Sequence, residues 1–297
     1  MRWQAGQRSG NIEDRRGAGG RMGGMGALPL GGGLLGIIVT VVLMLLGGGG
    51  LPGGGGSSGF PVPGFEQVPA AGPPGAEPLP GAPDPDAKLV DFVSFVLDDV
   101  QKLWDEQFRA AGERYVDAKL VLFTSAVRSG CGQASSVTGP FYCQLDRTVY
   151  IDLDFFRELS RRFAAPGDFA QAYVIAHEIA HHVQTLLGTS DRVRELGDKN
   201  ADDVNELSVR QELQADCYAG VWAHSTYQRG ILEAGDLEEG LTAAAAIGDD
   251  RIQETTTGRV DPESFTHGTS AQRVKWFNRG FEQGDADNCN TFAGESV

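Results

Sequence analysis

The stretch Ala172-Tyr173-Val174-Ile175-Ala176-His177-Glu178-Ile179-Ala180-His181, residues 172–181, decides how the rest of the chain is interpreted. On a helix, His177 and His181 lie on one face about one turn apart, and Glu178 directly follows the first of them. This HExxH spacing puts two imidazoles on one side of a metal ion and a carboxylate beside the water position. The apolar neighbours predict a buried helix, where a histidine pair is costly without a metal. We therefore interpret residues 177–181 as a zinc site, with Glu178 as catalytic base.

An ordinary helix, in which His181 and His182 only cap the core, is the competing interpretation of this stretch. On a helix, His182 points about 100° away from His181. We therefore expect His182 at the surface or behind the metal ligands, and not on the metal ion. Glu178 favours a catalytic site over a structural one, because a purely structural zinc site has no use for this carboxylate.

A catalytic zinc site needs a third protein ligand, and many carboxylates follow the motif. These carboxylates are Asp191, Glu195, Asp198, Asp202, Asp203, Glu206, Glu212 and Asp216. Spacing alone does not choose among them.

The segment Glu212-Leu213-Gln214-Ala215-Asp216 resembles the ExxxD element of gluzincin-type membrane zinc proteases. The resemblance implies that Glu212 binds the zinc from a second helix. It also implies that Asp216, one turn later, orients a zinc-binding histidine through the free N–H of its ring. The alternative is a solvated acidic helix face, although neighbours such as Leu213 and Trp222 indicate a largely buried helix, in which carboxylates need partners.

A third element of the same proteases, HPxxxxR, resembles Thr266-His267-Gly268 followed by Arg273, with Gly268 in place of the proline. The resemblance implies that His267 and Arg273 face the zinc and stabilise the oxyanion of the tetrahedral intermediate, a role that requires preorganised donors. The alternative is that His267 is a polar loop residue and Arg273 pairs with a surface acid.

Further motifs extend the resemblance over nearly the whole chain. They are Met1-Arg2-Trp3, Asn11-Ile12-Glu13-Asp14-Arg15-Arg16-Gly17, Gly139-Pro140-Phe141-Tyr142-Cys143, HEIAHHVQ at 177–184, ELQADC at 212–217 and HGTSAQRVKWF at 267–277. Together they closely resemble the putative neutral zinc metallopeptidase family. The resemblance implies a bacterial, membrane-anchored peptidase with one zinc ion per chain and a peptide or protein substrate.

Four cysteines, Cys131, Cys143, Cys217 and Cys289, all follow the apolar segment near the N-terminus. Four cysteines allow three pairings. We expect Cys131 to pair with Cys143, because only eleven residues separate them, which leaves Cys217 with Cys289. Four free thiols in a reducing compartment are the alternative. A zinc site made from the cysteines is disfavoured, since none of them shows CxxC spacing.

The N-terminal region has the charge pattern of a membrane anchor. Residues 1–26 contain five arginines against Glu13 and Asp14, and the uncharged residues 28–46 comprise nineteen residues, enough to span a bilayer. A cleaved signal peptide and a buried helix are the alternatives. The positive-inside rule predicts a cytoplasmic segment at 1–26, a single transmembrane helix at 27–46 and the rest of the chain outside the cytoplasm. Composition predicts a disordered Gly/Pro-rich linker at 47–86, followed by the metallopeptidase domain at 87–297. The family resemblance implies that this compartment is the bacterial cell envelope.

The 297-residue chain carries 25 Lys plus Arg against 40 Asp plus Glu, a net charge of −15. This charge repels a phosphate backbone and argues against nucleic-acid binding. Hydrophobic periodicity predicts helices near 86–112, 153–163, 169–187, 203–229, 237–252 and 270–281, and strands at 119–124 and 148–153. The expected fold is therefore α+β, a mainly helical zincin-like domain with a small sheet.

The gluzincin comparison suggests that residues 148–153 form the edge strand that holds an extended peptide antiparallel above the zinc. His224 lies on a different helical face from Glu212 and is assigned no role. The sequence thus predicts a membrane-anchored zinc metallopeptidase. The alternative is a membrane-tethered scaffold that keeps zinc without cleaving anything.

Overall fold

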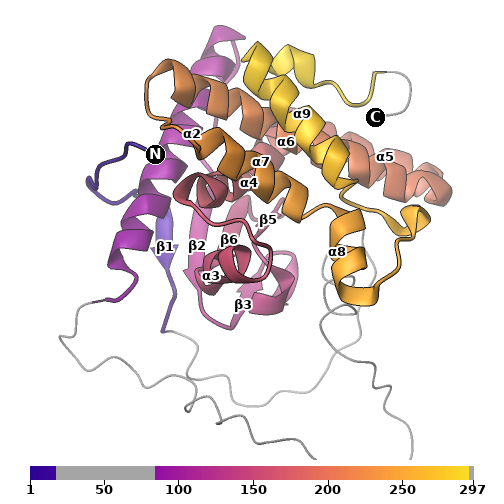
Figure 1. Cartoon of the computed structure of the whole chain (residues 1–297). Coiled ribbons are helices and arrows are strands. Elements are labelled where there is room, and N and C mark those ends of the chain that lie inside the picture. Colours follow the sequence, from indigo (N-terminus) through magenta and orange to yellow (C-terminus); the bar gives the residue numbers. More distant parts are fainter. Residues whose placement is uncertain (18–83, 294–297) are drawn as a thin grey trace, which may run out of the picture.

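The computed structural model describes residues 1–17 and 84–293, which form a mainly helical α+β domain with two small sheets (Figure 1). The helices are α2 (Ala87–Ala110), α3 (Asp154–Arg161), α4 (Asp168–Leu186), α5 (Thr189–Lys199), α6 (Val204–Gln228), α7 (Asp236–Ala246), α8 (Asp249–Thr257) and α9 (Ser270–Gln283). The strands are β1 (Ile12–Asp14), β2 (Lys119–Phe123), β3 (Ala126–Ser129), β4 (Gly132–Ser135), β5 (Phe141–Cys143) and β6 (Thr148–Asp152). Short 3-10 helices occupy Ser136–Thr138, Ala201–Asp203, Pro262–Ser264 and Ala286–Cys289.

The larger sheet has the strand order β1-β2-β6-β5. Strand β2 runs parallel to both β1 and β6, and β5 runs antiparallel to β6. All five residues of β6 are buried between its two neighbours. The prediction that residues 148–153 form an edge strand is therefore wrong, because the three-residue strand β5 covers that side.

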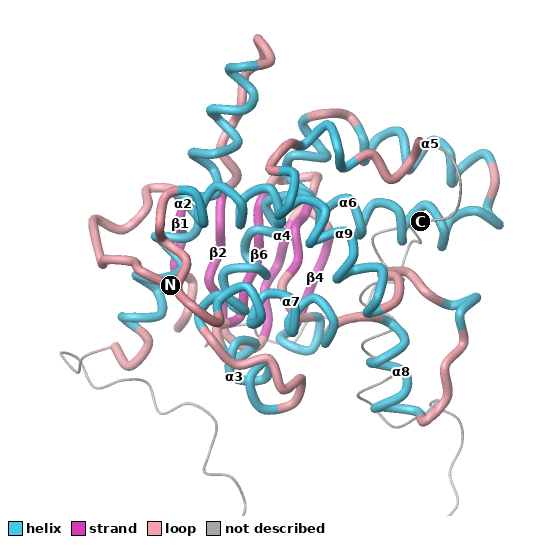
Figure 2. Tube along the Cα trace, turned by 45° about the horizontal axis from the view of Figure 1, so that its top comes forward, coloured by secondary structure: helices cyan, strands magenta, loops and turns pink. Residues whose placement is uncertain are grey.

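Alternating residues of the sheet enter two separate cores, as expected for successive side chains on a strand. Leu120 and Leu122 join the main core, whereas Val121 and Phe123 join a smaller cluster with Tyr150. Helices including α2, α4 and α7 gather on the main-core side (Figure 2). The sheet is thus buried on both faces, which explains the nearly continuous apolar run of β2.

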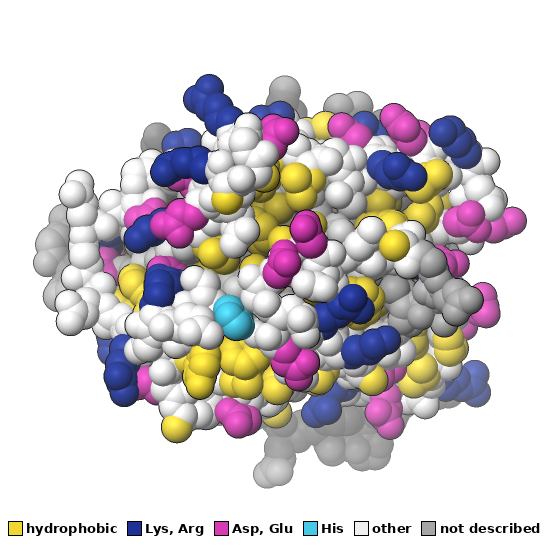
Figure 3. Space-filling view, turned by 90° about the horizontal axis from the view of Figure 1, so that it is seen from above, with side chains coloured by type: hydrophobic (Ala, Val, Ile, Leu, Met, Phe, Trp, Pro, Cys, Tyr) yellow, Lys and Arg dark blue, Asp and Glu magenta, His cyan; other side chains and the backbone are white. Residues whose placement is uncertain are grey.

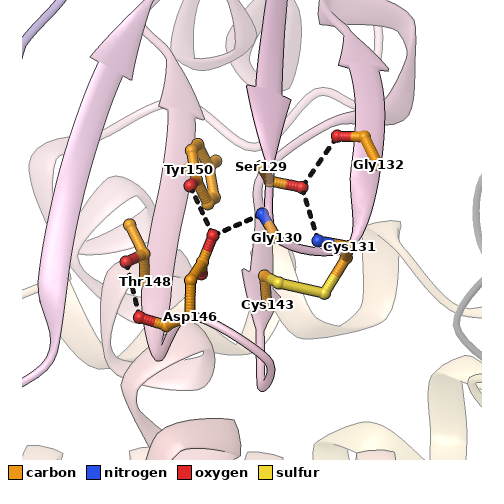
Figure 4. Close-up of a disulfide and its surroundings, with 8 residues drawn as sticks. All are labelled: Ser129, Gly130, Cys131, Gly132, Cys143, Asp146, Thr148 and Tyr150. Carbon is orange, nitrogen blue, oxygen red and sulfur yellow. Dashed lines mark hydrogen bonds between the residues drawn. A yellow bond between two sulfur atoms is a disulfide. The ribbon is translucent and has the colours of Figure 1, made fainter.

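The disulfide between Cys131 and Cys143 joins the β3–β4 hairpin to β5 (Figure 4). Beside it, the Asp146 carboxylate accepts hydrogen bonds from the backbone N–H of Gly130 at 2.5 Å and from the Tyr150 hydroxyl at 2.8 Å. A second disulfide joins Cys217 of α6 to Cys289. Both pairings are those expected from the sequence.

Helices α6 and α9 cross in close contact, and glycines permit this approach. A Cβ atom on Gly280 would lie 1.9 Å from the carbonyl oxygen of Cys217, and one on Gly220 would lie 2.1 Å from that of Phe277. No side chain fits at either position. The crossing brings Arg273, near the start of α9, against the segment of α6 that contains Asp216.

Residues 1–17 form an arm that packs on the domain (Figure 1). Its strand β1 extends the sheet, and the Trp3 ring lies 5.2 Å from that of Phe92. The guanidinium of Arg16 lies 2.7 Å from Asp84, so the arm and the start of the second described range are held together. Residues 1–17 of the segment predicted at 1–26 therefore lie against the domain.

This packing also bears on the predicted topology. Because β1 pairs with β2, residues 12–14 lie on the same side of any membrane as residues 120–122 of the domain. Among the helices of the two described ranges, none combines the length and apolar character that a membrane crossing requires. The predicted anchor at 27–46 lies outside those ranges, as does most of the linker predicted at 47–86, and both stay predictions.

The face shown in Figure 3 carries charged side chains of both signs. Lysines and arginines are interspersed there with aspartates and glutamates, and hydrophobic side chains are exposed between them. The acidic net charge of the chain is therefore not gathered into a patch of one sign on this face.

Candidate metal centre

Helices α4 and α6 bring the three predicted metal ligands together. His177 and His181 lie one turn apart on α4, and Glu212 approaches them from α6. The Nε2 atom of His177 lies 3.1 Å from Oε2 of Glu212, and Nε2 of His181 lies 3.4 Å from Oε1 of the same carboxylate. One carboxylate therefore faces both imidazoles.

The spacing of these atoms fits a tetrahedral zinc ion. One donor atom from each residue can be chosen so that all three lie within 4.8 Å of one another. Ligand atoms about 2.0–2.2 Å from a tetrahedral zinc lie roughly 3.3–3.5 Å apart. The two measured distances of 3.1 and 3.4 Å are close to this value.

The other ring nitrogens fix how each imidazole is protonated. Nδ1 of His177 lies 2.9 Å from Oδ1 of Asp216, and Nδ1 of His181 lies 2.9 Å from Oε1 of Gln184. A carboxylate and an amide oxygen accept hydrogen bonds only, so each Nδ1 donates its N–H. In the neutral rings, both Nε2 lone pairs then point at the Glu212 carboxylate. The two nitrogens and the carboxylate are all acceptors, so a cation or an added proton is required between them.

The pKa values of His177 and Glu212 in the folded protein also indicate that the site needs a positive charge. Burial by itself would lower the pKa of His177, but the Asp216 and Glu212 carboxylates outweigh it and raise this pKa to about 9. Burial would raise the pKa of Glu212, but the adjacent His181 and His177 hold it well below its usual value. The site therefore favours a positive charge between these three side chains.

Glu178, the predicted base, lies one residue after the first ligand and is buried, with 8% of its surface exposed. Burial raises the pKa of its carboxyl group, while the nearby His181 and His177 oppose this shift. A carboxylate of raised pKa is a better proton acceptor near neutral pH than an ordinary one.

Arg273 lies behind His177, on the side away from Glu212. Its Nε donates to Oδ2 of Asp216 at 2.8 Å and its Nη2 donates to Oδ1 at 3.0 Å, and Nη2 also donates to the Tyr173 hydroxyl at 3.2 Å. Its Nη1 donates to the Ile247 carbonyl at 3.3 Å. The predicted position of Arg273 facing the zinc is therefore wrong, because its guanidinium contacts Asp216, Tyr173 and the Ile247 carbonyl instead. Its partner is nevertheless buried and not a surface acid.

His267 lies in the loop before α9, and its Nδ1 is 3.0 Å from Oδ1 of Asp249. It lies close enough to Glu212 for its charge to contribute to the low pKa of that carboxylate. Gly268, where the gluzincin element has proline, has φ of 85°. Proline is locked near −65°, so this loop conformation excludes it.

A family profile described as "Putative neutral zinc metallopeptidase" matches residues 1–292. The chain belongs to this family. The match spans the N-terminal arm as well as the helices that contain His177, Glu212 and Arg273.

Two bacterial relatives of this zinc metallopeptidase family cover different shares of the chain. "Uncharacterized protein YpfJ" of Escherichia coli K12 is 49% identical over 302 residues, which is 100% of both chains. "Uncharacterized protein Rv2575" of Mycobacterium tuberculosis H37Rv is 48% identical over 190 residues, covering 60% of this chain and 64% of its own. No solved structure matches this chain significantly.

Two other histidines of this zinc metallopeptidase family member, His182 and His224, form hydrogen bonds within the fold. His182 is fully buried, where Nε2 donates to the Val116 carbonyl at 2.6 Å and Nδ1 accepts from the Tyr142 hydroxyl at 3.0 Å. It is thus not a surface residue, and it links α4 to β5. His224, to which no role was assigned, donates from Nδ1 to the Phe281 carbonyl at 2.6 Å.

Sequence reasoning missed Gln184, Tyr173 and Asp249 among the residues around the site. Gln184 follows His181 by three residues, the spacing of neighbours on a helix face. Helical spacing could therefore have predicted the contact between these two side chains. Tyr173 precedes His177 by four residues and donates to Asp216 at 2.5 Å. Asp249 carried no such signal, because it is far from His267 in sequence and begins a different helix.

Proposed function

We propose that the protein is a zinc-dependent peptidase that hydrolyses peptide bonds. The observation that carries the proposal is the pair of Nε2 atoms that face Glu212 at 3.1 and 3.4 Å, with Glu178 on the same helix. A zinc ion held by His177, His181 and Glu212 would polarise the scissile carbonyl and lower the pKa of the attacking water.

Glu178 serves as general base and then as general acid in this proposal. Its carboxylate accepts a proton from the attacking water and returns that proton to the leaving amine. Glu178 has a raised pKa and a buried side chain, both of which suit proton transfer near neutral pH. It need not bind the metal, because His177 and His181 approach from the same helix and Glu212 from α6.

Strand β5 is the proposed docking edge for an extended substrate. It is the last strand of the larger described sheet, next to β6, and Tyr142 within it contacts His182 of α4 at 3.0 Å. A peptide that adds to this edge would pair its backbone with β5 and pass beside the helix that contains the metal ligands. This role replaces the one first expected of β6.

An oxidising compartment outside the cytoplasm is proposed for the domain. The two disulfides support this location, since such bonds persist in secreted and periplasmic proteins and are rare in the cytosol. Attachment to a membrane through residues 27–46 remains a separate proposal, constrained by the packing of residues 1–17 on the domain.

Hydrolysis of a mixture-based peptide library tests the proposed function. We expect the purified zinc-loaded protein to cleave peptides, a strong chelator to stop cleavage, and added zinc to restore it. A His177→Ala variant should neither retain zinc nor cleave. Failure of the zinc-loaded parent to cleave any peptide in the library would contradict the proposal and favour the zinc-binding scaffold.

A further inference from the structure

A row of hydrogen bonds runs from His181 through two glutamines to the segment that follows α9. Nδ1 of His181 lies 2.9 Å from Oε1 of Gln184 on α4. Nε2 of Gln184 donates to Oε1 of Gln214 on α6 at 3.0 Å, and Nε2 of Gln214 donates to the carbonyl oxygen of Cys289 at 3.1 Å. Both glutamines are buried, so their amide groups depend on these partners. The row thus connects a proposed zinc ligand to a distant part of the chain.

The far end of this row fixes the direction of each bond in it. A backbone carbonyl only accepts hydrogen bonds, so Gln214 turns its amide nitrogen towards Cys289 and its oxygen towards Gln184. The nitrogen of Gln184 faces that oxygen, and it also donates to the Gln211 carbonyl at 2.7 Å. The oxygen of Gln184 is left for His181, whose Nδ1 therefore carries the proton. Nε2 of His181 is then the ring nitrogen that can bind zinc.

A disulfide holds the carbonyl at the end of the row. Cys289 is bonded to Cys217 of α6, and the Thr291 hydroxyl donates to the Arg210 carbonyl of the same helix at 2.6 Å. Gln214 follows Arg210 by four residues and precedes Cys217 by three, the spacings of neighbours on one helix face. The segment after α9 is therefore fastened along the face of α6 from which Gln214 extends, and the disulfide is its covalent anchor.

We propose that Gln214 is a positioning residue for His181, and that the disulfide between Cys217 and Cys289 holds the carbonyl on which Gln214 depends. The proposal rests on the zinc site of the proposed function. Groups that contact a metal-binding histidine through its other ring nitrogen set the orientation of the ring and the affinity for the metal. In this protein the support continues beyond Gln184, the direct partner of His181. Breaking the disulfide therefore weakens zinc binding through the two glutamines.

Methionine at position 214 tests the link between the glutamines, because it is similar in size to glutamine and has no amide group. In Gln214→Met, one buried N–H of Gln184 loses its acceptor. We expect zinc affinity to fall by about 10-fold, the lower end of the range for such outer partners. Gln101→Met is the matched control, since Gln101 is also buried and its Oε1 accepts from the backbone N–H of Ala118 at 2.6 Å. This control should lose stability and keep the zinc affinity of the parent.

Alanine in place of both cysteines tests the anchor without leaving thiols, which are themselves zinc ligands. Cys217→Ala/Cys289→Ala should lower zinc affinity by about fivefold, less than the loss of a direct partner of the ligand. In the Gln214→Met background the same change should lower it by less than about twofold, because the disulfide acts through Gln214. Cys131→Ala/Cys143→Ala is the control for losing a disulfide and should keep the zinc affinity of the parent. Only zinc affinity is compared for this control, because Cys143 lies in β5, the proposed docking edge.

Competition with a chelator measures the zinc affinity of each protein, and thermal unfolding of the metal-free forms measures stability. Parent-like zinc affinity of Gln214→Met would overturn the proposal, as would an equal loss in Gln101→Met or a disulfide effect that persists in full without Gln214. Gln214→Met keeps both disulfides, so it provides a test that does not depend on folding without them. Zinc affinity is measured without substrate. A parent that binds zinc and cleaves no peptide would therefore contradict the peptidase function and not the role of Gln214.

Discussion

Nδ1 of His177 lies 2.9 Å from Oδ1 of Asp216, and this contact joins the helix of the HExxH motif to the helix that supplies Glu212. Arg273 extends the contact to a third helix by holding both oxygens of the same carboxylate. All three side chains are buried. The orientation of a metal-binding imidazole therefore depends on packing among α4, α6 and α9.

Removing Arg273 should destabilise the whole domain. Arg273→Ala removes the guanidinium that holds both oxygens of the fully buried Asp216, and breaking a buried pair in this way costs about 3–5 kcal/mol. Denaturant unfolding of the metal-free protein measures the loss. The control is Arg194→Ala, which removes an exposed pair with Asp191 and should change stability by less than about 0.5 kcal/mol. A loss below about 1 kcal/mol for Arg273→Ala would contradict the assigned role.

Gln184 should tune zinc affinity although it does not bind the metal. Its amide oxygen accepts from His181 at 2.9 Å, and its nitrogen donates to the Gln211 carbonyl and to Gln214. Loss of such an outer partner typically weakens metal binding by about 10–100-fold. Competition with a chelator measures the affinity of Gln184→Ala. Gln144→Ala is the control, because this side chain bonds to Asp191 at the surface. Its zinc affinity should match the parent, and equal affinities for all three proteins would refute the prediction.

Zinc binding should release a proton from His177. Its pKa of about 9 lies above the ordinary imidazole value, so the ring is mostly protonated at pH 7.5 and must lose this proton to bind zinc. The apparent zinc affinity should therefore fall as the pH drops below 9. Calorimetry at pH 7.5 in buffers of different ionisation enthalpy counts the protons. We expect about one from His177, against about 0.1 for an imidazole of ordinary pKa. Release of less than about half a proton would contradict this expectation.

The arm and the domain should be accessible from the same side of any membrane. Gly10 and Lys102 are both exposed, and no heavy atom lies within 4 Å of a Cβ at Gly10. In intact cells, Gly10→Cys and Lys102→Cys should react alike with a membrane-impermeant maleimide, because the native cysteines are paired in disulfides. Labelling of one variant before lysis and of the other only after it would contradict the packing of β1 on β2.

The sequence predicted the elements whose pattern is long and periodic. The expected helix at 169–187 is α4 at Asp168–Leu186, and the strand expected at 119–124 is β2 at Lys119–Phe123. Strands β1 and β5 have only three residues each, too few to show a period of two. Without them, neither the interior position of β6 nor the docked arm was visible in the sequence.

For the site as well, local spacing predicted some side-chain positions, whereas others depend on contacts between distant segments. The positions of His177 and His181 follow from helical spacing, whereas Glu212 was selected from many carboxylates by resemblance. The partner of Arg273 depends on how α9 crosses α6, a packing that local pattern does not encode. The sequence therefore placed His177, His181 and Glu212 in one predicted site but did not show on which side of His177 the arginine lies.

Hydrolysis by the zinc-loaded parent and by Glu178→Gln, assayed together with metal analysis, tests the central claim most directly. Glutamine keeps the shape of Glu178 but cannot accept the proton of the attacking water. The account predicts one zinc ion per chain in both proteins, and a rate for the variant lower by about 10²–10⁴-fold. Equal rates in the two proteins, or a parent that cleaves no peptide with its zinc bound, would contradict it.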